Sequence, residues 1–148
     1  MSRVRAVRIA AIAVMAIGGP GCFHTPKGVD DLSTPALVWS QGNGLCSRIL
    51  AVDAGRTVWI DQGCETPVDF DEVRTVTAAQ MDDLWMKFDA LPFDQSASSC
   101  DAMMHGFQRY APPSSTVSVA ACGGTMYDDL TGLPDAFLPL AEALRALE

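Results

Sequence analysis

The residues best suited to chemistry lie together in the stretch CDAMMHGF, residues 100–107. Asp101, Met103 and Met104 precede His105, which is one of two histidines in the chain. Thioether and imidazole ligands suit Cu(I), and an imidazole beside a carboxylate could activate a nucleophile as a general base. The sequence has neither a Met-x-Met series nor a G-x-S-x-G elbow to support these uses. We therefore expect no catalytic residue, no metal site and no cofactor. A small enzyme that uses His105 and Asp101 is an alternative.

The cysteines predict two disulfides rather than a metal site. The chain has five cysteines, and no two of them form a C-x2-C pair. A turn signal at residues 53–56 lies between two runs rich in β-branched residues, which predicts a hairpin. Counting outward from this turn places Cys46 opposite Cys64, within disulfide reach. We therefore predict the pairs Cys46–Cys64 and Cys100–Cys122, each stabilising the fold by about 3 kcal/mol.

The amino terminus predicts export. Arg3, Arg5 and Arg8 form a basic start, residues 9–17 are an uncharged apolar run, and residues 18–21 read GGPG. A basic start, an apolar run and small residues at its end are the three parts of a secretory signal. The run is shorter than the roughly 20 residues that a membrane-spanning helix needs. We therefore expect residues 1–21 to be a signal peptide.

The end of this signal, Gly21 followed by Cys22, resembles that of a bacterial lipoprotein precursor, in which a small residue precedes the cysteine that receives the lipid. The resemblance covers the signal segment only. It implies a fatty acid such as palmitate on Cys22, which becomes the mature amino terminus, and a membrane-anchored protein of the bacterial cell envelope facing the periplasm or the outside. Cys22 is also the cysteine left over from the two predicted disulfides. The alternative is a secreted soluble protein, cut after Gly18 or Gly21.

The charge of the mature chain limits the classes of partner that it can bind. Residues 22–148 contain seven basic and eighteen acidic side chains, a net charge of −11. Such a surface repels nucleic-acid phosphates and anionic lipid headgroups. We therefore expect no nucleic-acid partner, contact with the membrane through the lipid anchor, and an unknown protein partner.

Residue patterning predicts one domain behind a tether. Residues 22–36 mix Pro, Gly, Ser, Thr and Asp without apolar period, which is typical of a lipidated amino terminus followed by a flexible tether. Residues 37–148 then form a single α+β domain. Strand-like runs fill residues 36–64 and 104–130.

Two helices complete the predicted domain. Thr77 and Gln80 fit a capping box, and an apolar stripe follows until Pro92. A second amphipathic helix is expected from about Pro139. The fold is therefore expected to be a small two-layer domain, a mostly antiparallel sheet with two helices on one face. The expected core comprises Trp39, Trp59, Met81, Leu84, Trp85, Phe88, Phe107, Val117, Val119, Phe137, Leu140 and Leu144.

The resulting functional hypothesis is a non-catalytic lipoprotein domain that acts by binding or structural interaction. Its first alternative is a secreted protease inhibitor that presents the segment RYAPPSST, residues 109–116. Two prolines there would pre-organise a loop and lower the entropy lost on binding. A small envelope enzyme using His105 and Asp101 is the second alternative.

Overall fold

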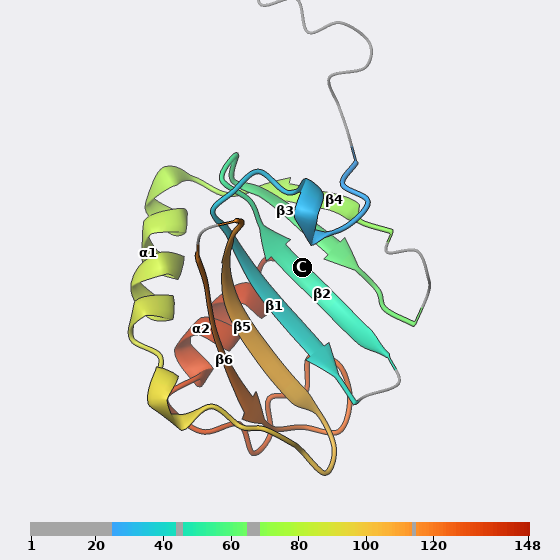
Figure 1. Ribbon diagram of the computed structural model, residues 1–148, viewed down its shortest axis with the longest axis vertical. Coiled ribbons are helices and arrows are strands. Elements are labelled where there is room, and N and C mark those ends of the chain that lie inside the picture. The colour runs from blue at the N-terminus through green and yellow to red at the C-terminus, as the bar shows by residue number, and fades with distance from the viewer. Residues whose placement is uncertain (1–24, 44–45, 65–68, 114) are drawn as a thin grey trace, which may run out of the picture.

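Six antiparallel strands form a single sheet in the computed structural model, in the order β4-β3-β2-β1-β5-β6 (Figure 1). Helices α1 and α2 lie together on one face of this sheet, so the predicted two-layer α+β fold is confirmed. The structure describes residues 25–43, 46–64, 69–113 and 115–148, and the predicted signal peptide and Cys22 lie outside them. The strands are β1 (Ala36–Gly42), β2 (Ser47–Val52), β3 (Thr57–Asp61), β4 (Asp71–Thr75), β5 (Met104–Ala111) and β6 (Ser115–Cys122); the helices are α1 (Ala78–Asp89) and α2 (Leu138–Arg145), with single 3-10 turns at Val29–Asp31 and Phe93–Gln95.

The hairpin between β2 and β3 turns at the predicted position, where the buried carboxylate of Asp53 fixes it. The N–H of Thr57 donates to Asp53 Oδ1 at 3.0 Å, and the indole N–H of Trp59 donates to Asp53 Oδ2 at 2.9 Å. Arg56, the last turn residue, has a left-handed φ of 67°. The carboxylate thus replaces the water that the free N–H groups of the turn would otherwise bind.

Both predicted disulfides are present. The register of the β2–β3 ladder, continued past its last pair, brings Cys46 opposite Cys64, and their Cα atoms lie 4.5 Å apart. Cys100 and Cys122 form the second bridge, with Cα atoms 5.4 Å apart, and tie the loop before β5 to the end of β6. Hairpin register and disulfide connectivity are therefore confirmed together.

The two helices begin as the sequence predicts. Gln80 N–H donates to Thr77 Oγ1 at 3.1 Å and Thr77 N–H donates to Gln80 Oε1 at 2.8 Å, which completes the capping box of α1. A short turn precedes α2, which carries Pro139 in its first turn, where no N–H is needed. The side chains buried between sheet and helices include Leu37, Trp39, Leu50, Val52, Val58, Ile60, Met81, Leu84, Phe88, Phe107, Val119, Phe137, Leu140 and Leu144.

The described part of the predicted tether folds with the domain. Leu32 is buried on the face of the sheet opposite the helices, in a cluster that includes Val38, Trp59 and Phe70. Ala54 N–H donates to the Ser33 carbonyl at 2.8 Å, which links this segment to the β2–β3 turn. The domain therefore includes residues 25–36 in addition to the predicted 37–148, because isolated apolar side chains anchor a segment that has no periodic pattern.

Candidate binding surface at the disulfide end of the sheet

Both disulfides lie at one end of the sheet, which we call the disulfide end. It carries the two bridges and two long loops, residues 96–103 and 123–133 (Figure 1, bottom). Two open grooves of about 360 and 530 Å³ occur there, and both are lined in part by Ser99, Cys100 and Ala102. The loop before β5 therefore forms a wall that the two grooves share.

The smaller groove lies on the face of the sheet opposite the helices. Its floor is made by small side chains of β1, β2 and β5, and the side chains that line it are uncharged. A Cβ added to Gly106 would lie 2.7 Å from Ser40 Oγ, so a side chain at this position would displace the Ser40 hydroxyl that lines the floor. The lining is Ser40, Gly42, Asn43, Ser47, Ser99, Cys100, Ala102, Met104 and Gly106.

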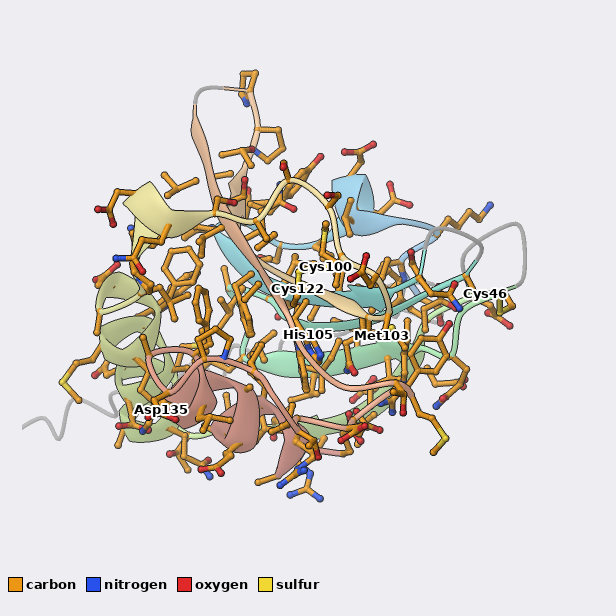
Figure 2. The ribbon with its side chains drawn as sticks, turned by 90° about the horizontal axis from the view of Figure 1, so that it is seen from below. Cys46, Cys100, Met103, His105, Cys122 and Asp135 are labelled. Carbon is orange, nitrogen blue, oxygen red and sulfur yellow. A yellow bond between two sulfur atoms is a disulfide. The ribbon has the colours of Figure 1, made fainter. Side chains whose placement is uncertain are left out.

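His105 lies inside the packing beside these grooves, between the sheet and the helix layer (Figure 2). Its side chain is fully buried. The indole N–H of Trp39 donates to its Nδ1 at 3.3 Å, and its Nε2 lies 2.8 Å from the carbonyl oxygen of Gly123. A carbonyl can only accept, so Nε2 carries the proton and His105 is neutral. Both ring nitrogens are thus used to join β1, β5 and the 123–133 loop.

Protonation of His105 is expected to destabilise the fold. Burial lowers the pKa of His105 below 6.5, and the hydrogen bond to Gly123 and the charges of Asp128 and Asp129 only partly oppose this effect. The unfolded chain therefore takes up a proton near pH 6.5 that the folded protein does not accept until lower pH. Stability should consequently be complete above pH 6.5 and fall as the pH is lowered through the window beneath it. Urea unfolding from pH 8 to pH 5 measures this slope.

The matched variants for this prediction exchange each histidine for glutamine. His105→Gln should lose most of the slope between pH 6.5 and 5, whereas His24→Gln should keep it. An unchanged slope in His105→Gln would assign the acid sensitivity to other groups.

A second polar network holds the 123–133 loop to the sheet through Asp128. The side-chain amide of Gln41 donates to Asp128 Oδ1 at 3.1 Å, and Asp128 N–H donates to Gln41 Oε1 at 2.6 Å. Arg48 Nη1 lies 2.5 Å from both Asp128 carboxylate oxygens and 2.8 Å from Glu148 Oε1. Asp128 itself has a left-handed φ of 65°. These contacts offset the backbone strain and orient the loop.

Within the loop, Asp129 forms a separate turn. Hydrogen bonds from Thr131 and Thr125 lower the pKa of Asp129 to about 2. The Tyr127 hydroxyl lies 3.9 Å from Cys64 Sγ, so the loop also contacts the first disulfide. The loop is thus shaped from within and attached to β1, β2 and both bridged segments.

The structure does not assemble the candidate chemistry of residues 100–107. Asp101 is exposed, while His105 is buried and bonded to Trp39 and Gly123. Met103 is buried and lines the larger groove, and Met104 lines the smaller one. Across the described ranges, no group of three or more His, Cys, Asp or Glu side chains could hold a metal ion.

The 109–116 segment belongs mostly to a β-ladder. Arg109 pairs with Val117 and Tyr110 with Thr116 across the β5–β6 hairpin, which leaves the two prolines at its turn. The Arg109 guanidinium lies 4.5 Å from the Trp85 ring centroid and 3.2 Å from a carboxylate oxygen of Asp89. Arg109 is therefore engaged by α1.

Sequence reasoning missed the network around Asp128. Gln41, Arg48 and Asp128 belong to no sequence motif. Their contacts join residues that lie 80 or more positions apart, so no local spacing could have revealed them. The only available signal was the unusual concentration of Gly and Asp in residues 123–132.

Comparison with protein-family models, curated proteins and solved structures finds no match for this chain. The two disulfides indicate an oxidising, extracytoplasmic compartment. Among the described residues, no helix has both the length and the apolar character to cross a membrane. Fold and bridges thus define a disulfide-held, extracytoplasmic α+β domain.

Proposed function

We propose that this protein is a bacterial cell-envelope lipoprotein, anchored by lipid on Cys22, whose domain binds a partner at the disulfide end without catalysis. The proposal of a lipid anchor is supported by the way in which the cysteines pair. The domain's four cysteines pair with each other, which leaves Cys22 as the fifth, directly after a signal-like segment. A lipid would occupy its thiol in a compartment where free thiols oxidise.

The hydrogen bonds of His105 and the uncharged lining of the smaller groove favour binding over catalysis. His105 is neutral and uses both ring nitrogens inside the fold, so it has no free position for a substrate proton. The disulfide end instead offers two grooves and a braced loop, and the floor of the smaller groove is uncharged. Such a surface suits an uncharged polar segment of a protein partner.

The anchor is tested by the mass of the mature protein from its own envelope. The amino-terminal peptide should begin at Cys22 and carry the added mass of acyl chains. An unmodified peptide beginning at residue 19 or 22 would instead support the secreted soluble protein.

The binding surface is tested with a photo-crosslinking amino acid at Met126, compared with the same amino acid at Met86. Both side chains are similarly exposed, at 68% and 65%, but Met126 lies in the 123–133 loop and Met86 on α1. A defined cross-linked product should form in the intact envelope from position 126 and be absent from position 86. Equal products from both positions, or a product from position 86 alone, would contradict binding at the disulfide end.

A further inference from the structure

We propose that the domain sits directly on its membrane, with its N-terminal end against the phospholipid headgroups and its disulfide end pointing away. The N-terminal end is the part of the sheet that carries residues 25–33 and the β2–β3 turn, residues 53–56. This orientation rests on the lipid proposed at Cys22. It deepens that proposal by naming the surface that meets the membrane.

The first support is the fixed position at which the chain enters the domain. Pro26 and Leu32 are buried, and Lys27 N–H donates to Asp31 Oδ2 at 2.9 Å. The Tyr110 hydroxyl donates to Asp30, which attaches the same segment to β5. The loops 96–103 and 123–133 lie at the opposite end of the sheet (Figure 1). The chain therefore enters at a defined point remote from both grooves.

The second support is the short chain between the anchor and this point. Cys22 and Thr25 are separated by three peptide units, which span at most about 11 Å. A tether that ran from Cys22 to residue 36 would have reached about 50 Å. Since the docked segment removes most of that length, the anchor holds the N-terminal end within about 11 Å of the headgroups.

The third support is the distribution of unpaired basic side chains. Of the basic residues that the structure describes, five donate to a carboxylate or a carbonyl oxygen elsewhere in the fold: Arg48, Arg74, Lys87, Arg109 and Arg145. The two without a polar side-chain partner are Lys27 and Arg56, and both lie at the N-terminal end.

The nearby acids of this end accept hydrogen bonds from neutral donors within the fold and keep their negative charge. Asp31 accepts from Lys27 N–H, Asp30 from Tyr110, and the buried Asp53 from the turn. The ammonium of Lys27 and the guanidinium of Arg56 have no such side-chain partner and are the groups of this end that can contact lipid phosphates. Contact of these two cations with lipid phosphates favours this end over the rest of the acidic surface, while the short chain to Cys22 sets the distance.

The test uses the mature protein in vesicles of phosphatidylethanolamine and phosphatidylglycerol that contain a nitroxide-headgroup lipid. A fluorescent amino acid replaces either Ala54, exposed in the β2–β3 turn, or Met126, exposed at the disulfide end. Quenching at position 54 should be several-fold stronger than at position 126. A Gly-Ser spacer inserted between residues 24 and 25 should bring the two values together.

The charge contribution is tested with two double reversals of equal net change. Lys27→Glu with Arg56→Glu should reduce quenching at position 54, whereas Arg74→Glu with Lys87→Glu should leave it unchanged. Vesicle flotation is recorded in the same samples and reports the anchor alone. Protein that floats with equal quenching at both positions, or whose quenching ratio survives the spacer, overturns the orientation and leaves the anchor standing. Protein that does not float overturns the anchor itself.

Discussion

Replacing Cys22 by serine is expected to move the protein completely from the membrane fraction to the soluble fraction. Serine keeps the size of the side chain but lacks the thiol that would take the acyl group. Each methylene that an acyl chain buries in the bilayer contributes about 0.8 kcal/mol to binding. Loss of the chains removes all of this free energy, and the net charge of −11 on the mature chain offers no electrostatic replacement.

The measurement is fractionation of cells grown with labelled palmitate, followed by immunodetection. His24→Ser is the matched control, because it changes a residue two positions away and leaves the cysteine in place. The control should carry label and stay with the membrane. If Cys22→Ser remained in the membrane fraction after a salt wash, the anchor would lie elsewhere in the chain.

The predictable parts of this fold are those in which partners are close in sequence. The turn at residues 53–56 set the register of β2 and β3, and that register alone placed Cys46 against Cys64. Thr77 and Gln80 satisfy each other across one helical turn, so the start of α1 was visible in four residues. Local geometry decides such features, and tertiary packing does not override them.

The N-terminal segment shows why composition alone failed to define the domain. Residues 25–35 contain few apolar side chains and no period, as a tether does. Leu32 nevertheless buries against Val38 and Trp59 of β1 and β3, on the face that the helices leave open. A single well-placed leucine stabilises by about 1.5–3 kcal/mol when buried, which is enough to dock a short segment. The spacing of residues in the segment does not predict that the sheet offers Leu32 a surface to pack against.

The candidate surface was even less predictable than the fold. Cys100 and Cys122 were found by elimination, and His105 was singled out for chemistry that its two hydrogen bonds prevent. The ion pairs that hold the 123–133 loop depend on the ends of β1, β2 and α2 meeting, and only the assembled sheet brings them together.

The largest single-residue loss of stability among these contacts is expected for Arg48→Met. Methionine retains the buried apolar stem but leaves the carboxylates of Asp128 and Glu148 without their shared cation. Breaking a buried ion pair costs about 3–5 kcal/mol. Because the side chains of Asp128 and Glu148 are 29% and 21% exposed, water reduces this cost. We expect the free energy of unfolding to fall by about 3 kcal/mol at neutral pH.

The free energy of unfolding of Arg48→Met should also depend on pH differently from that of the parent protein. Burial raises the pKa of Glu148, and the Arg48 guanidinium opposes that rise, so its removal should raise the pKa further. A group whose folded pKa is raised destabilises the fold as the pH increases through its titration, because the unfolded chain releases the proton first. The deficit of Arg48→Met should therefore be largest at neutral pH and shrink as the pH falls through the raised pKa of the folded state towards 4.5, the ordinary value for Glu.

Urea unfolding and amide hydrogen exchange measure these effects, with Arg74→Met as the matched control. Arg74 is exposed and donates to the Glu148 carbonyl at 3.4 Å, so its loss should change the free energy of unfolding by no more than about 0.5 kcal/mol. In Arg48→Met, exchange should accelerate at the Asp128 N–H, which donates to Gln41, while the N–H groups of α1 follow only the global loss. A stability within 0.5 kcal/mol of the parent would show that the Gln41 contacts alone hold the loop, and that the charges around Asp128 are not what shapes the disulfide end.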